Sequence, residues 1–261
     1  MLAIQKQLSN WFYALLSLPA TGMGFALSVQ ISALSWILTT QYGLKIDEVG
    51  FVWLSGPLAG IIGQLAVGSV SDNTWFWGGR RRPYMIIGGV LAALMLLCLP
   101  NLDKIATAFG IANMMVVGLA VALTLDLAIN VSFNPTRSVI ADVTPEGNAR
   151  TKGYTWMQTI SGAFGVLAYA ISVWFGNYAL IYFGVALVLL FSIIPTFFIT
   201  EPRTLKPQAV TTNKVKETNS TELMKIYVAH GFTWLGVQTM FVFMFAFIQS
   251  TMGLTDNNEM G

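Results

Sequence analysis

Seven long apolar stretches divide this chain of 261 residues, and they leave few folds open to it. A helix that crosses the hydrocarbon core of a bilayer needs about 20 mostly apolar residues, and it must bond its own backbone polar groups internally. Each of the seven stretches is close to that length. We therefore predict an all-α polytopic membrane protein whose transmembrane helices cover residues 11–38, 49–70, 84–99, 108–133, 154–175, 178–199 and 229–252.

The composition excludes several classes of protein. Charged residues make up 10% of the chain and hydrophobic residues 55%, and the mean hydropathy is +0.64. A soluble domain carries about 25% charged residues, so a soluble enzyme, a disordered chain and a nucleic-acid-binding protein are excluded. Because Cys98 and His230 are the single residues of their types, we expect no internal disulfide, no cysteine or histidine-pair metal site and no cofactor.

The basic residues predict how the helices are oriented. If the N-terminus is cytoplasmic, twelve of the 14 lysines and arginines fall in cytoplasmic segments, and only Lys45 and Lys104 fall outside. Short loops on the cytoplasmic side of a membrane carry this excess of lysine and arginine. We expect a multi-pass protein of the cell (inner) membrane with a cytoplasmic N-terminus.

The spacing of the stretches suggests three parts. Residues 1–200 are predicted to form a six-helix bundle, residues 201–228 a polar cytoplasmic linker, and residues 229–261 the first helix of an incomplete second bundle. This organisation is that of the first half of a twelve-helix protein with one further helix. We therefore expect the chain to be truncated or a fragment, and the full protein to be a monomer.

Asp126 is the strongest candidate for a functional residue, because it lies in the middle of the fourth predicted span. A carboxylate at the centre of such a helix costs about 2.5–3.5 kcal/mol, so it usually faces a cavity and has a task. Asn130 shares its helix face, and a carboxylate beside an amide can bind sugar hydroxyls or carry a proton. Gln30 and Gln158 are further polar candidates for the same cavity. The alternative is a structural aspartate paired with an arginine elsewhere.

A second candidate is the loop after the second span, which runs from Gly68 through Asp72 to the arginines at 80–82. Gly68 permits close helix contact, and the opposite charges can form a salt-bridge latch at the cytoplasmic rim. The alternative is that the arginines only anchor the loop at the cytoplasmic surface. Similarly, the Gly56–Gly60 pair favours close helix packing over a direct functional role.

The loop resembles the signature G-x-x-x-D-(R/K)-x-G-R-(R/K) of the major facilitator superfamily, with a longer insert. Its Ser71-Asp72…Gly79-Arg80-Arg81-Arg82-Pro83 form is similar to that of the sucrose–proton symporters in the glycoside–cation symporter group. Three further stretches, at 24–27, 56–60 and 125–142, resemble the same group, so the resemblance covers about residues 22–165. Asn73 departs from the signature, because a basic residue usually follows the aspartate.

The resemblance implies a major-facilitator N-terminal bundle and a sugar–proton symporter that works by alternating access on a glycoside such as sucrose or maltose. It implies that Asp126 couples the proton and contacts the sugar. It also implies a cytoplasmic gate that includes Asp72, Arg80, Arg81, Arg137 and Asp142. A sodium-coupled or facilitative carrier of another small solute is the alternative. A receptor leaves the basic loop unexplained, and an intramembrane enzyme lacks a catalytic pair within the spans.

Overall fold

The computed structural model describes residues 6–201 and 219–252, apart from some side chains of α4 and α9. In these residues it is helical, and the order along the chain is α2 (Asn10–Thr40), α3 (Ile46–Trp53), α4 (Ser55–Asn73), α5 (Arg82–Cys98), η1 (Leu99–Asn101), α6 (Leu102–Phe109), α7 (Met114–Val143), α8 (Asn148–Phe198) and α9 (Ser220–Met252).

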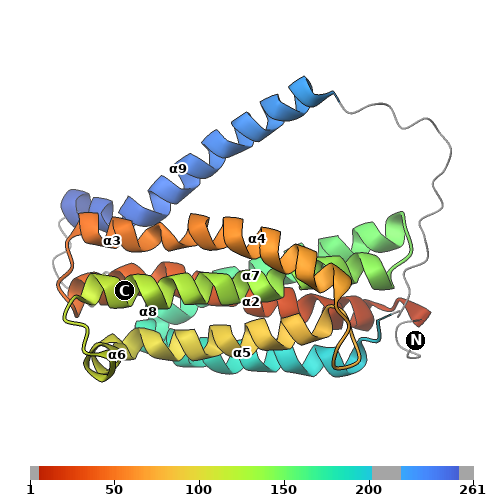
Figure 1. Ribbon diagram of the computed structural model, residues 1–261, viewed down its shortest axis with the longest axis horizontal. Coiled ribbons are helices and arrows are strands. Elements are labelled where there is room, and N and C mark those ends of the chain that lie inside the picture. Colours follow the sequence, from red (N-terminus) through yellow and green to blue (C-terminus); the bar gives the residue numbers. More distant parts are fainter. Residues whose placement is uncertain (1–5, 202–218, 253–261) are drawn as a thin grey trace.

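The long helices α2, α4, α5, α7 and α8 run side by side along the long axis of the molecule, and α9 leans away from them (Figure 1). α2 packs on α8, while α7 packs on both α4 and α5. The core lies along α2, where Phe12, Leu16, Met23 and Phe25 are fully or almost fully buried. The bundle is therefore built around two neighbouring helices, α2 and α7, which carry the central polar residues described below.

Five helical stretches in the described part of the chain are long and apolar enough to cross a membrane: residues 10–40, 46–63, 82–109, 114–143 and 148–198. Their outward faces carry large apolar side chains such as Val166, Trp174 and Phe197, each at least 70% exposed. Exposure of these side chains to water would be unfavourable, whereas in a bilayer they face lipid. The chain is an integral, multi-pass membrane protein of the all-α class.

The fifth and sixth predicted spans both lie in α8, which turns at Gly176. This glycine has φ 82° and ψ 164°, a backbone conformation that the other amino acids rarely adopt. Ser172 and Asn177 flank the turn, and both bond Ser32 of α2. The turn thus separates two helical segments, as the sequence predicts. The seventh predicted span lies within α9, which begins nine residues earlier, at Ser220.

The fourth span begins and ends later than the sequence predicts. The short helix α6 occupies the loop expected between the third and fourth spans, and Gly110, with φ 67°, ends this helix. Asn113 then caps α7, because its side-chain oxygen accepts from the backbone N–H groups of Met115 and Val116. α7 continues to Val143. Arg137 and Asp142, expected in a cytoplasmic loop, therefore lie on α7 itself.

The second predicted span is broken near its start. α3 ends at Trp53 and α4 begins at Ser55, because Pro57 has no N–H to donate to the carbonyl of Trp53. α4 then runs through Asn73, and Thr74 bonds the carbonyl of Val70 with both its N–H and its hydroxyl. The expectation that Asp72 lies just past the helix end is wrong, since this capping keeps it within α4.

Candidate functional site

Asp126 lies inside the bundle, at the contact of three helices. Its side chain is 6% exposed. Its Oδ2 atom accepts a hydrogen bond of 2.7 Å from the hydroxyl of Ser55, the first residue of α4, and one of 3.1 Å from Nε2 of Gln30 on α2. Both donors act on the same oxygen, and such bonds are stronger when the carboxyl group is ionised. The carboxyl group thus joins α2, α4 and α7.

The break between α3 and α4 is what places Ser55 at this site. The backbone N–H of Leu58 still bonds the carbonyl of Leu54 at 3.3 Å, but residue 57, a proline, has no N–H for the carbonyl of Trp53. Here Pro57 interrupts the pattern, and Leu54 forms a turn whose N–H bonds the carbonyl of Phe51. Ser55 is fully buried at this elbow. Sequence reasoning did not single out Ser55, and Pro57 inside an apolar stretch was the available signal.

Gln30 has an unsatisfied acceptor beside Asp126. The residue is fully buried, and its Oε1 atom has no hydrogen-bond partner among the described residues. A buried polar atom without a partner costs about 1–3 kcal/mol. Such an atom next to a carboxyl group can accept a hydrogen bond from a ligand hydroxyl.

The other two predicted central residues have different surroundings. Asn130 donates from Nδ2 to the backbone carbonyl of Asp126 at 2.8 Å. It also packs on Gly63 of α4, where an added Cβ would lie 2.7 Å from the Asn130 Cβ. Gln158 is exposed on α8 and is not among the residues bonded to Asp126. The structure therefore brings Gln30 to the carboxyl group, leaves Asn130 on its helix, and keeps Gln158 apart.

The second cluster lies at the end of the bundle where α5 begins. Asp142 accepts from Arg80 Nη2 at 3.0 Å and lies 3.4 Å from Arg81 Nε, and these three side chains are 9–13% exposed. Arg81 also donates from Nη1 to Ser71 of α4 at 2.9 Å. These contacts tie α4, the loop before α5 and the end of α7 together. They would have to break if the helices separated here.

Among the described side chains, Arg137 does not join this ion-pair cluster. Its guanidinium lies over the ring of Phe133, 4.3 Å from the ring centroid, and the residue is exposed. Gly68 and Asp72 lie in α4 at positions where the structure describes the backbone only. Of the predicted gate residues, the described side chains of Arg80, Arg81 and Asp142 come together.

Glu201 is a further member of the cluster that sequence reasoning assigned to the linker. Its carboxylate accepts from the backbone N–H groups of Arg80, Arg81 and Arg82 at 2.8, 2.8 and 2.7 Å, and it is 8% exposed. A carboxylate at the N-terminus of α5 also complements the helix dipole. The available signal was an acidic residue directly after the sixth apolar stretch.

The turn before α5 brings these three N–H groups to one point. Phe76 and Gly79 exchange two backbone hydrogen bonds of 3.1 Å, and Trp77 and Gly78 between them have φ 48° and 71°. Gly79 lies against Glu201, since an added Cβ would be 2.7 Å from its Oε1. The tight turn and the bare glycine let the carboxylate reach three successive amides.

We predict that Glu201→Gln releases this turn without unfolding the bundle. Hydrogen bonds to a charged group are worth about 1.5–3 kcal/mol, so hydrogen exchange at the amides of residues 80–82 should become about 10 to 100 times faster. Hydrogen–deuterium exchange of the peptide that covers the turn measures this change. Glu222→Gln on α9 is the control, because Glu222 is exposed and pairs only with Lys225 in the described chain. Equal exchange in wild type and Glu201→Gln would contradict the assignment.

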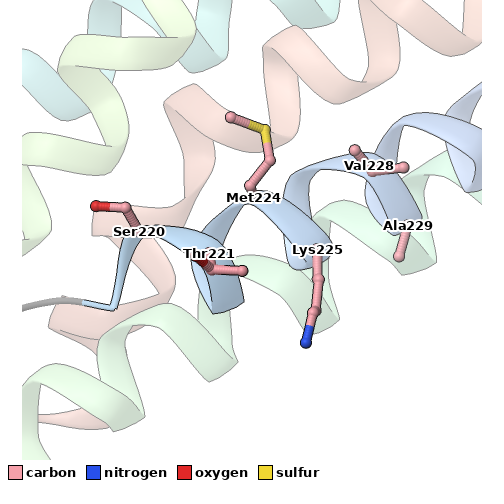
Figure 2. A pocket seen from close by; sticks show the side chains of 6 residues that line it. All are labelled: Ser220, Thr221, Met224, Lys225, Val228 and Ala229. Carbon is pink, nitrogen blue, oxygen red and sulfur yellow. The ribbon is translucent and has the colours of Figure 1, made fainter.

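Two hollows border α9. One, of about 610 Å³, lies between α9 and the α3–α4 elbow and is lined by Trp53, Pro57, Trp234 and Gln238 among others. The other, of about 630 Å³, follows one face at the start of α9 (Figure 2). In Figure 2 its six lining side chains all belong to α9, and Met224 and Lys225 point in different directions. The first hollow is lined in part by Leu54, which directly precedes Ser55, so it is the relevant one for a site.

Comparison with known proteins matches residues 16–261 to the sequence profile of the Major Facilitator Superfamily. Over 171 residues, 63% of this chain and 33% of the relative, the chain is 30% identical to a sucrose transport protein of Arabidopsis thaliana. Over 91 residues, 35% of this chain and 17% of the relative, it is 36% identical to a sucrose transport protein of Oryza sativa subsp. japonica.

A third relative is the general alpha-glucoside permease of Schizosaccharomyces pombe, which is 25% identical over 171 residues, 59% of this chain and 31% of the relative. The chain therefore spans about a third or less of the length of these curated relatives. Two of the three are named for sucrose transport and one as an alpha-glucoside permease.

Proposed function

Because this chain belongs to the Major Facilitator Superfamily, a superfamily of transporters and not of enzymes, we propose that it serves the symport of a glycoside with a proton by alternating access. The sugar is the finer part of the proposal, and it is supported by relatives that are named for sucrose and alpha-glucoside transport. No metal or organic cofactor enters the proposal, and the proton is the coupling ion. We propose a cytoplasmic N-terminus, the cell membrane as location and a monomer as the working form.

The observation that carries the proposal is the carboxyl group of Asp126, buried among α2, α4 and α7. An ionised carboxylate in such a site is expensive unless hydrogen bonds stabilise it. Ser55 and Gln30 supply two such bonds, both to Oδ2. A carboxyl group held in this way can exist with or without a proton, which a coupling residue requires.

The same group is suited to bind a sugar. A sugar hydroxyl is both a donor and an acceptor, and it can donate to a carboxylate or to an amide oxygen. The unsatisfied Oε1 of Gln30 is an acceptor of this kind next to Asp126. We propose that Asp126 and Gln30 contact the sugar. Asn130 supports the backbone of α7 at the acid through its bond to the Asp126 carbonyl.

In this proposal the ion pairs of Arg80 and Arg81 with Asp142 close the cytoplasmic side. They join α7, which carries Asp126 in its middle, to the loop before α5. Separation of the helices at this end must break these pairs and expose charges that are now mostly buried. The cluster therefore favours a state closed on this side, and Glu201 holds the arginine backbone in place.

The test is uptake of radiolabelled maltose or sucrose by cells that produce the protein from its own gene. We expect accumulation when the outside is made acidic, and its loss when a protonophore abolishes the proton gradient. A sodium gradient alone should have no effect. Accumulation that follows sodium, or equilibration without accumulation, would instead favour the sodium-coupled or facilitative carrier. Absence of any saturable uptake of either sugar contradicts the proposal.

A further inference from the structure

We propose that the cavity between the α3–α4 elbow and α9 holds the second ring of a disaccharide whose first ring lies at Asp126, with Trp234 as the stacking surface and Gln238 as the polar edge. This inference rests on the proposed function, since it takes Asp126 as the site of the first ring. It names a binding site on α9, which is a different part of the chain from the helices that hold Asp126.

The cavity lies close to the central acid. It has a volume of about 610 Å³, within the range of about 300–1,000 Å³ that is usual for small-molecule sites. Gly56 lies at the junction between the two regions. The point that its Cβ would occupy is 3.9 Å from Asp126 Oδ2 and 3.8 Å from Gln238 Nε2. The side chains of Asp126 and Gln238 therefore both approach Gly56, which has no side chain between them.

One face of α9 lines the cavity. Gly231, Trp234, Leu235, Gln238 and Thr239 follow the i, i+3, i+4, i+7, i+8 pattern, so they form a stripe along the helix. The opposite wall consists of Gly50, Trp53, Leu54 and Pro57 from α3 and the start of α4. The cavity thus has apolar and aromatic walls with Gln238 nearest to the acid.

The indole N–H group of each tryptophan is hydrogen-bonded. Trp53 donates from Nε1 to Ser35 Oγ at 2.8 Å, and Trp234 donates from Nε1 to His230 Nε2 at 2.8 Å. Because both indole N–H groups are already bonded, what these rings offer to the cavity is their apolar surface. Trp53, which is 7% exposed, is a preformed surface that binds with little loss of side-chain entropy.

This chemistry fits a pyranose ring better than a lipid chain. A pyranose has C–H faces that can stack on an aromatic ring, and a rim of hydroxyl groups that need donors and acceptors. Trp234 supplies the aromatic ring, and the Gln238 amide supplies a donor and an acceptor. A lipid chain would offer the Gln238 amide no polar partner, which is unfavourable.

The test compares two ligands that share their first ring, maltose and methyl α-glucoside, on the complete chain in lipid nanodiscs. We expect maltose to bind more tightly than methyl α-glucoside. Trp234→Leu should weaken maltose about tenfold, the upper end of an aromatic contact, and Gln238→Leu should weaken it by up to about tenfold through the lost hydrogen bond. Neither change should affect methyl α-glucoside. Trp234→Phe should retain most of the maltose affinity, because it keeps an aromatic face. Phe232→Leu is the control, since Phe232 is on the same helix, 70% exposed and outside the cavity.

The outcomes separate this inference from the function on which it rests. Equal losses for both sugars in Trp234→Leu, or no loss for either, overturn the second-ring site, and the proposed function stands if Asp126→Asn still removes binding of both. The second-ring site is also overturned if Trp234→Leu and Gln238→Leu release a lipid probe from the cavity but leave maltose binding unchanged. If neither sugar binds the wild-type chain, both the inference and the proposed function fail.

Discussion

Asp126→Asn is expected to abolish proton-driven accumulation of sugar, down to the level of membranes that lack the protein. The asparagine side chain has nearly the same shape, and its oxygen can still accept from Ser55 or Gln30. An amide cannot take up and release a proton in this pH range, so the coupling step is lost while the fold is kept. Uptake of labelled sugar under an imposed proton gradient measures the effect.

Asp47→Asn is the matched control for this experiment. Asp47 lies in the first turn of α3, is exposed, and undergoes the same chemical change. We expect its uptake to remain at the wild-type level. Wild-type accumulation with unchanged pH dependence in Asp126→Asn would remove the basis of the proposed mechanism.

Gly88→Ala is expected to destabilise the bundle more than any other single added methyl group considered above. A Cβ on Gly88 would lie 2.6 Å from the backbone nitrogen of Ser132 and 2.7 Å from the carbonyl oxygen of Ala128. Both atoms belong to the backbone of α7, so neither can rotate away. Overpacking of this kind costs about 1–3 kcal/mol. A lower midpoint of thermal unfolding in detergent, followed by circular dichroism, measures the loss.

Gly162→Ala makes the same change at a position with open space. Gly162 lies in α8, and an added Cβ there would have no heavy atom within 4 Å. Alanine is a better helix former than glycine, so we expect a gain of up to about 1 kcal/mol. Opposite signs at the two glycines support close α5–α7 packing. Equal shifts would show that the helices do not approach as closely as described.

Much of the architecture follows from the solvent in which the chain folds. A bilayer requires about 20 apolar residues in each crossing helix. Each such stretch can be recognised in the sequence by itself, without knowledge of the helices that pack around it. The helical, multi-pass class and the approximate positions of the spans were predicted in this way. The same reasoning located Asp126, because a carboxylate in an apolar stretch is conspicuous wherever the helix packs.

The bounds of the helices were predicted less well, for a local reason. Hydropathy does not show where a helix ends when its last turns are polar, and α7 continues ten residues beyond its apolar part. The caps at Asn113 and Thr74 and the left-handed Gly110 set the observed ends. As a result, Asp142 and Arg137 are helical residues, although their polar character is typical of a loop.

Gln30 was a candidate from the sequence, whereas Ser55 beside the central acid and Glu201 at the arginine turn came from the packing of helices alone. Ser55 lies 71 positions before Asp126, and Glu201 lies 121 positions after Arg80. Periodicity in a sequence relates residues within a few turns of one helix, so it carries no information on such pairs. They depend on how closely α4, α5 and α7 approach one another, which small residues such as Gly63, Gly79 and Gly88 permit. The lengths of the apolar stretches thus specify the membrane fold, and a charged residue within one of them identifies the central acid. The close packing of the helices determines which groups surround that acid.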